Sequence, residues 1–184
     1  MVLITQSGPE TLPIGSPAPD FSLPGIDGNF HTLQSLSGGA AVVLNFTCNH
    51  CPYAQAYEDR AMALVREFAP KGVAFAAINP NDAERYPDDS FEKMKERAAA
   101  RGFNFPYLRD ESQAVARAYG AVCTPHLFVI AGGAIVYEGR IDDNWKDPAA
   151  ARHHDLRAAL EAVLAGRPVP TPNTNPMGCS IKWK

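Results

Sequence analysis

The sequence lacks several features that would assign it to a large class of proteins. No apolar run approaches the ~18 residues of a membrane-spanning helix, and no positively charged segment opens the chain, so we expect no signal peptide. Lys and Arg (17) are fewer than Asp and Glu (20), the formal net charge is −3, and no basic cluster occurs. These absences argue against a nucleic-acid partner and a membrane partner. The expected location is cytoplasmic.

Cysteine is also scarce, because the 184 residues hold four of them, too few for a disulfide scaffold. Cys48 and Cys51 form one close pair, and in reducing compartments such pairs are more often catalytic or metal-binding than structural. A structural zinc site would need a second set of closely spaced ligands, so we expect no such metal site. The sequence also has no Gly-rich phosphate-binding loop, and we expect no organic cofactor.

The pair lies between two contrasting patterns. Val42–Phe46 is a short apolar run typical of a buried strand. Pro52 suits the first position of a helix, and apolar residues then recur at three- and four-residue steps, as in an amphipathic helix. Cys51 thus falls at a helix start, where unpaired N–H groups and the helix dipole favour an anion. The pattern predicts a thiol with a lowered pKa, and a protonated His50 would favour the thiolate further.

The rest of the chain alternates between predicted strands and helices. A hairpin is predicted around Asp27-Gly28 and a second near the end of the chain. Asp89 is predicted to open a helix through a capping box with Glu92, and Asp147 to cap the last helix with Pro148 at its first position. Further elements are predicted at 73–78 (strand), 103–108 (strand), 111–119 (helix), 126–130 and 134–138 (strands). This order predicts a central sheet with helices on both faces and antiparallel strands at its end.

The length is that of one domain with a sizeable core. We expect a single domain over 1–184, with its core at about 13–166. The tail, 167–184, is rich in Pro and Asn and is expected to be ordered or semi-ordered, with Cys179 on a flexible part of it. Tyr53 and Tyr57 are predicted on the core face of their helix, and Trp145 on the surface.

Four features together resemble the redoxin branch of the thioredoxin-like superfamily, which is peroxiredoxin-related and AhpC/TSA-like. They are the Pro17–Leu23 segment with Asp27-Gly28, the strand before Cys51 with its helix, Thr124-Pro125 ahead of a strand, and the final hairpin and helix. The resemblance implies a thioredoxin-like α/β fold. This is a three-layer α/β/α sandwich with a mixed central sheet and an N-terminal β-hairpin extension.

Two shorter motifs narrow the resemblance. Cys48-Asn-His-Cys-Pro-Tyr53 and Gly178-Cys-Ser-Ile-Lys-Trp183 are similar to a peroxiredoxin-like subgroup described as thiol–disulfide isomerases or thioredoxins. The resemblance implies thiol–disulfide exchange, with a protein disulfide or a peroxide as substrate. An external dithiol reductant, such as a thioredoxin, or a low-molecular-weight thiol would restore the protein, and an antioxidant role follows.

The resemblance also implies roles for the residues of the site. Counted from Phe46, Cys51 holds the helix-start position of the thioredoxin nucleophile, and residue 54 is Ala. We therefore expect Cys51 to attack and Cys48 to resolve from the strand side. Supporting roles fall to residues around the pair and in the loop that is expected to face it through a cis proline: Thr47, His50, Pro52, Thr124 and Pro125. Peroxiredoxins place Thr three residues before their reactive Cys, whereas Thr47 lies four before Cys51.

Three interpretations remain open from the sequence. The first is a disulfide reductase or isomerase, the second a thiol peroxidase with Cys51 as the peroxidatic thiol, and the third a non-enzymatic metal or copper carrier. Cys123 is either a small core residue or an additional redox thiol. Cys179 either folds back as a resolving thiol or is a free cysteine.

Overall fold

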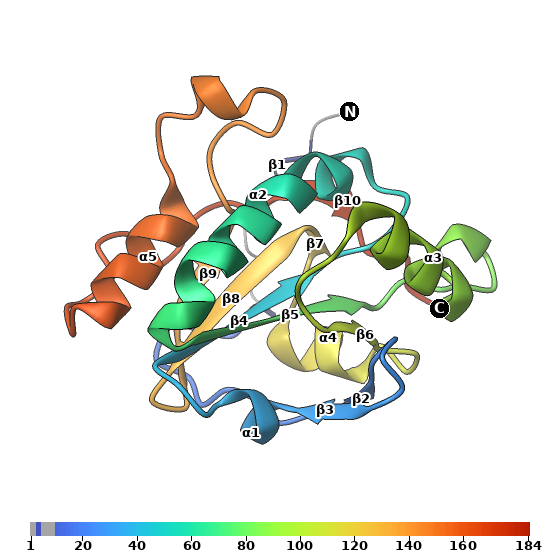
Figure 1. Ribbon diagram of the computed structural model, residues 1–184, viewed down its shortest axis with the longest axis horizontal. Helices are drawn as coiled ribbons and strands as arrows, with labels where there is room; N and C mark the ends of the chain where they lie inside the picture. The colour runs from blue at the N-terminus through green and yellow to red at the C-terminus, as the bar shows by residue number, and fades with distance from the viewer. Residues whose placement is uncertain (1–2, 5–9) are drawn as a thin grey trace.

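The computed structural model describes residues 3–4 and 10–184 (Figure 1). Its helices are α1 (Leu33–Leu36), α2 (Pro52–Phe68), α3 (Phe91–Arg101), α4 (Ala114–Tyr119) and α5 (Asp155–Leu164), with short 3-10 turns η1 (Ala69–Lys71), η2 (Pro87–Asp89) and η3 (Pro148–Ala150). Its strands are β1 (Leu3–Ile4), β2 (Ser22–Pro24), β3 (Phe30–Thr32), β4 (Ala41–Phe46), β5 (Val73–Asn79), β6 (Tyr107–Arg109), β7 (Cys123–Thr124), β8 (His126–Ala131), β9 (Ala134–Gly139) and β10 (Met177–Ser180). Among the described residues, no helix is both long and apolar enough to cross a membrane.

The central sheet has the strand order β6-β5-β4-β8-β9. Strands β4, β5 and β6 run parallel, whereas β8 is antiparallel to β4 and β9 is antiparallel to β8. The mixed sheet expected from the sequence is therefore confirmed. Strand β4 lies in the middle and is covered on both faces, which explains its unbroken apolar run.

Helices cover both faces of this sheet (Figure 1). One face packs against α2, α3 and α5, and the other against α1, α4 and the β2–β3 hairpin. Side chains of the first layer include Val43, Phe68, Leu127, Leu156 and Leu160. Side chains of the second include Leu23, Leu33, Leu44, Tyr119 and Phe128. The three-layer α/β/α sandwich and its N-terminal hairpin are thus confirmed.

Two helix starts differ from the prediction. Helix α3 is capped by Ser90, whose hydroxyl accepts from the Lys93 N–H at 3.4 Å. The side chain of Asp89 points into the protein instead. Asp147 caps only the short turn η3, where it accepts from the Ala149 N–H at 2.9 Å, and α5 begins later, at Asp155. In both places a good capping residue was identified, but tertiary packing set the helix boundary.

The end of the chain is also more ordered than predicted. Strand β10 pairs with β7, placing Cys179 opposite Thr124, and with β1, placing Gly178 opposite Leu3. Beyond β10, the carbonyl of Lys182 accepts from the Asp82 N–H at 2.8 Å and from the Gln113 side chain at 2.9 Å. We call residues 177–184 the C-terminal strap. Cys179 therefore lies in a hydrogen-bonded ladder, and its predicted flexibility is wrong.

Gly178 lets the strap pass close to the β7–β8 connection. A Cβ atom at this position would lie 2.2 Å from the carbonyl oxygen of Thr124, far inside van der Waals contact. Any larger residue would push the strap away from the loop that carries Pro125. The strap is thus fitted to one place on the surface, next to the end of β4 where the cysteine pair begins.

Candidate active site

Cys48 and Cys51 lie where the chain leaves β4 and enters α2. Cys51 is the N-cap of α2 in an extended conformation, and Pro52 occupies the first helical position, as predicted. Both thiols are almost fully enclosed, with 2% of Cys48 and 0% of Cys51 exposed. The helix start thus presents Cys51 to the protein interior.

Thr124 contacts both sulfur atoms. Its peptide bond to Pro125 is cis, as the resemblance implied. The Cys48 Sγ lies 3.2 Å from the Thr124 hydroxyl, and the Cys51 thiol donates to the Thr124 carbonyl oxygen at 3.1 Å. The β7–β8 connection and the β4–α2 turn, far apart in sequence, therefore meet at the two thiols.

Cys51 is the more acidic thiol of the pair. A hydrogen bond from Cys48 lowers the pKa of Cys51, and further hydrogen bonds from the Ala54 N–H and from the side chain and backbone of Cys179 add to this, giving a pKa of about 5. Burial opposes this shift, and so does the Thr124 carbonyl, which favours the protonated thiol. The hydrogen-bond donors around the Cys51 sulfur outnumber the single acceptor, the Thr124 carbonyl, so the thiolate is favoured at neutral pH.

The pKa of Cys48 is shifted in the opposite direction. Its hydrogen bond to Cys51 raises the pKa of Cys48 well above the usual value, and burial and the negative charge of Asp89 raise it further. The pair thus consists of one thiolate and one thiol that holds its proton. This is the asymmetry that an attacking and a resolving cysteine require.

Asp89 is a fully buried carboxylate beside the pair. One of its oxygens accepts from the Asn49 backbone N–H at 2.7 Å and from the Asn79 amide at 3.3 Å. The other accepts from His50 Nδ1 at 2.6 Å and from the Asn81 amide at 2.8 Å. The sequence pattern around Asp89 predicts a helix cap, and the position of this carboxylate beside the thiols was therefore not predicted. The sequence does contain one indication of it: Ser90 can cap α3 by itself, which leaves the side chain of Asp89 available for another contact.

Asn49 fixes the turn between the two cysteines. Its side chain donates to the Asp88 carbonyl at 2.8 Å and accepts from the Tyr107 hydroxyl at 2.9 Å. Its own carbonyl accepts from the Gln55 amide at 2.7 Å. Because backbone and side chain are both held, the spacing between the two sulfur atoms is defined by the protein.

His50 is hydrogen-bonded to Asp89 and lies near Cys48. The ring of His50 stacks on Tyr86, with centroids 5.5 Å apart, and 27% of the side chain is exposed. The ligating atoms of Cys48, His50 and Asp89 lie within 4.8 Å of one another. These atom types also bind zinc and copper, but each Asp89 oxygen already accepts two N–H groups. The arrangement is suited to moving a proton between Cys48 and the imidazole.

The other side of Cys51 is formed by the strap and by aromatic residues. Cys179 is partly exposed and packs with Tyr53 and Trp145 against the cysteine pair. The rings of Tyr53 and Trp145 lie 4.4 Å apart. Tyr53 is buried, as predicted for the core face of its helix, and it packs with the thiols. Trp145, predicted to lie on the surface, is instead partly buried against the same cluster. Tyr57 is buried in the core as predicted.

The remaining predicted residues also lie near the pair. Cys123 is fully buried on β7, and its Sγ lies 3.5 Å from the Pro125 carbonyl oxygen. Thr47 lines a cavity of about 10 Å³ beside Cys48, together with Asn45. The side-chain oxygen of Asn45 is buried and has no hydrogen-bond partner. A space of this size is at the lower limit of what can hold one water molecule.

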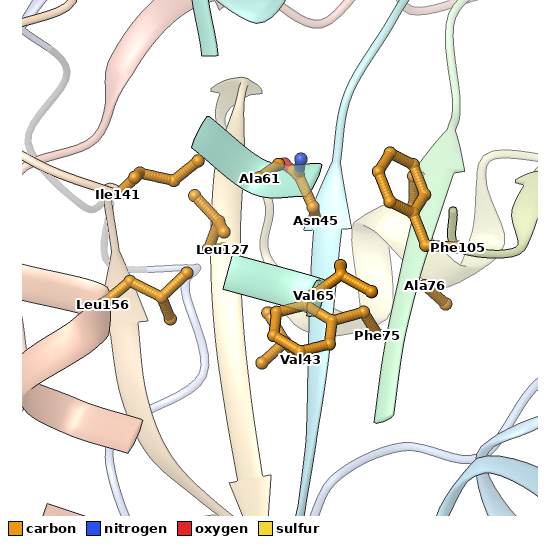
Figure 2. A pocket seen from close by; sticks show the side chains of 11 residues that line it. Val43, Asn45, Ala61, Val65, Phe75, Ala76, Phe105, Leu127, Ile141 and Leu156 are labelled. Atoms are coloured by element: carbon orange, nitrogen blue, oxygen red, sulfur yellow. The ribbon is translucent and has the colours of Figure 1, made fainter. Parts of the chain in front are cut away.

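A second cavity, of about 20 Å³, lies between α2 and the sheet (Figure 2). Figure 2 shows apolar side chains of β4, β5, β8 and α2 pointing into it, with Asn45 as its polar member. Its lining holds no cysteine, histidine or charged residue. We therefore assign the chemistry to the thiol cluster and treat this space as a feature of core packing.

The fold and the placement of the thiols define a redox protein of the thioredoxin-like class. The chain matches the AhpC/TSA family over residues 14–138. It therefore belongs to the AhpC/TSA family, within the redoxin branch of the thioredoxin-like superfamily.

Individual relatives agree with this assignment. The thiol-disulfide oxidoreductase ResA of Geobacillus thermodenitrificans is 33% identical over 121 residues, which are 64% of this chain and 63% of ResA. The chain thus matches less than two thirds of that relative's length. An uncharacterized conserved protein from Geobacillus kaustophilus has a crystal structure that superposes with a TM-score of 0.89, at 45% identity, covering 94% of this chain and 93% of the other.

A more distant structure shows the fold alone. The thioredoxin domain of a thiol-disulfide oxidoreductase from Bacteroides vulgatus superposes with a TM-score of 0.59 at 20% identity, covering 70% of this chain and 89% of that domain.

Proposed function

We propose that this protein is a thiol–disulfide oxidoreductase in which Cys51 attacks and Cys48 resolves. The observation that carries the proposal is the position of Cys51 as the N-cap of α2, where the helix start favours a thiolate, with Cys48 on the strand side against the Thr124 hydroxyl. The pKa shifts agree with this, down to about 5 for Cys51 and well up for Cys48. Both sulfur atoms contact the same residue, Thr124, so they are held close together. The ResA relative, itself named a thiol-disulfide oxidoreductase, supports the assignment.

The proposed cycle begins with the Cys51 thiolate. It attacks one sulfur of a substrate disulfide, forming a mixed disulfide and releasing the first substrate thiolate. Cys48 then attacks the Cys51 sulfur and releases the second thiolate. Two electrons pass to the substrate, and the protein ends with a Cys48–Cys51 disulfide. An external dithiol or low-molecular-weight thiol then reduces this disulfide and restores the two thiols.

The resolving step needs a proton acceptor, because Cys48 holds its proton strongly. His50 supplies the nearby imidazole, within 4.8 Å of Cys48, and Asp89 orients its ring through Nδ1 at 2.6 Å. We assign to this His–Asp pair the removal of the Cys48 proton, as in other catalytic dyads that combine an imidazole with a buried carboxylate.

Peroxide is the second candidate substrate, and the burial of the thiols favours it. With 2% and 0% exposure, Cys48 and Cys51 are accessible to a small molecule more readily than to a protein disulfide. Attack of the Cys51 thiolate on the peroxide would break the O–O bond and give a sulfenic acid and hydroxide, which takes up a proton to become water. The Cys48 thiol would then attack the Cys51 sulfur, forming the Cys48–Cys51 disulfide and releasing the second water.

Trapping on single thiols tests the assignment of roles. The Cys48→Ser/Cys179→Ser variant retains Cys51, and the Cys51→Ser/Cys179→Ser variant retains Cys48. Each is treated with a small aromatic disulfide at pH 7 and mapped by mass spectrometry. We expect a stable adduct on Cys51 and, over the same time, almost none on Cys48. Faster adduct formation on Cys48 would show that the roles are reversed.

The same variants separate the two substrates. With one equivalent of hydrogen peroxide and a sulfenic-acid reagent such as dimedone, a peroxidase gives a labelled Cys51. An adduct from the disulfide without any dimedone label identifies disulfide exchange as the activity.

A further inference from the structure

The redox pair is enclosed, yet it must receive electrons from outside. Cys48 and Cys51 are 2% and 0% exposed, and Cys123 is 0% exposed. Of the four cysteines, all of which lie in the described residues, Cys179 is the one with appreciable exposure. An external thiol therefore meets Cys179 before it meets either member of the pair.

Cys179 also contacts the pair directly. Its side chain and backbone form hydrogen bonds to the Cys51 sulfur, which Cys48 contacts as well. Cys179 packs against the cluster that holds Cys48 and Cys51, so Cys48 and Cys179 both border Cys51. The position of Cys179 is built into the fold, because β10 places it opposite Thr124 and Trp145 packs beside it.

We infer that Cys179 is the exchange thiol of this protein, the sulfur through which an external thiol reduces the buried Cys48–Cys51 disulfide. The inference rests on the proposed function and adds the route by which reducing equivalents arrive. The partner is identified by its chemistry alone, a thiol on a small molecule or on a protein.

The exchange proceeds in balanced steps. The Cys179 thiolate attacks the Cys51 sulfur, so that a Cys51–Cys179 disulfide forms and Cys48 leaves as a thiolate that takes a proton from His50. An external thiolate then attacks the exposed Cys179 sulfur and releases the Cys51 thiolate. A second external thiol attacks that mixed disulfide and releases Cys179. Two external thiols become one disulfide, and the protein regains three thiols.

The charges at the site favour this order. In the reduced protein, burial together with the hydrogen bond and charge of Cys51 raises the pKa of Cys179 to about 11, which makes it a poor attacker of substrate. Once Cys51 is in a disulfide, its charge and that hydrogen bond are gone, while Lys182 still favours the Cys179 thiolate. Cys179 is thus activated when the pair is oxidised, and in the next step, the external attack on the Cys51–Cys179 disulfide, the acidic Cys51 is a good leaving group.

The test compares wild type with Cys179→Ser. Both are oxidised with one equivalent of peroxide, the Cys48–Cys51 disulfide is verified by mass spectrometry, and its reduction by glutathione or by a thioredoxin-type dithiol protein is followed. We expect the disulfide to form in Cys179→Ser and its reduction to slow about tenfold or more. Ser180→Ala, an exposed neighbour on the strap, is the matched control and keeps the wild-type rate.

The outcomes separate the inference from the proposed function. Slowing with both reductants, or with one of them, supports the exchange role and identifies the source of the thiol. Wild-type reduction rates in Cys179→Ser overturn the inference and leave the proposed function standing. If the Cys48–Cys51 disulfide forms in neither protein, the proposed function itself fails.

A trapping experiment gives a second, independent readout. In Cys48→Ser, mild oxidation should produce a Cys51–Cys179 disulfide. Limiting glutathione should then leave its adduct on Cys179, as mapped by mass spectrometry. An adduct found on Cys51 instead would overturn the inference.

Discussion

Two regions of different construction meet at the Cys51 sulfur. On the Cys48 side, a buried carboxylate, an imidazole and three asparagines form a dense hydrogen-bonded network around Asp89. On the Cys179 side, a single strand of the C-terminal strap lies beside the rings of Tyr53 and Trp145 and is partly open to solvent. The first region is made of polar contacts between loops, and the second of close packing along a β-ladder.

The difference separates two needs of thiol chemistry. The network can hold or accept a proton next to Cys48 because the buried Asp89 fixes the imidazole ring of His50. The strap can give access, because its thiol is the one that solvent reaches. A single thiol pair in either environment would have one of these properties without the other.

Asp89→Asn, which disrupts the hydrogen-bonded network on the Cys48 side, is expected to have the largest effect on stability and on the resolving step. The amide would place an N–H group against donors that now meet a carboxylate. We expect a loss of about 3 kcal/mol in the free energy of unfolding and a slowing of the resolving step by about 10²-fold. Denaturant titration and rapid-quench analysis of disulfide formation measure the two quantities.

Asp88→Asn is the control for this substitution, since Asp88 is the adjacent, exposed carboxylate. It should change the free energy of unfolding by no more than about 0.5 kcal/mol. If Asp89→Asn loses stability but resolves at the rate of wild type, Asp89 is structural and the proton-transfer role is wrong.

A smaller effect is expected from displacing the Cys179 side with Gly178→Ala. The added methyl would lie 2.2 Å from the Thr124 carbonyl oxygen, so the strap must shift outward. We expect a loss of about 2 kcal/mol in the free energy of unfolding and faster alkylation of Cys51 by iodoacetamide. Gly38→Ala, where no atom lies within 4 Å of the added Cβ, should change neither. Unchanged alkylation in Gly178→Ala would show that the strap does not shield Cys51.

The smallest effect concerns the hydrogen bond between the two thiols. Cys48→Ala removes the donor that lowers the pKa of Cys51 most, so this pKa should rise by about one unit, or about 1.4 kcal/mol. Cys48→Ser keeps an O–H donor and should therefore raise the pKa of Cys51 by less. A pH titration of thiolate absorbance near 240 nm measures the pKa of Cys51 in both variants and in wild type. For wild type we expect a titration midpoint at about pH 5. Equal midpoints in all three proteins would contradict this origin of the acidity.

The lowered pKa of Cys51 also determines how the stability of the folded protein depends on pH. The folded-state pKa of Cys51, about 5, lies below its unfolded value of about 8.5. Ionised Cys51 therefore contributes stability that is fully present above about pH 8.5 and is lost as the pH falls toward 5. Activity that depends on the Cys51 thiolate should decline over the lower part of this range.

The reactive helix start could be predicted from sequence because it depends on neighbours in the chain. Val42–Phe46, Cys51 and Pro52 identified the strand, the cap and the first turn, and the structure has them at these positions. The cis bond before Pro125 followed from the family resemblance. Asp89 was misassigned because the local pattern around it fits a cap equally well, and the choice between Asp89 and Ser90 was made by distant partners such as Asn49.

The amino-acid sequence by itself determined the class of fold, the paired thiols at the end of a buried strand, and the position of Cys51 at a helix start. These features arise from hydrophobic periodicity and from backbone groups within a few residues. Only the tertiary structure decided that Asp89 would approach the pair and that Cys179 would lie against Cys51. Both depend on the register of segments far apart in the chain, above all on Gly178 fitting against the Thr124 carbonyl, and no local pattern encodes such a fit.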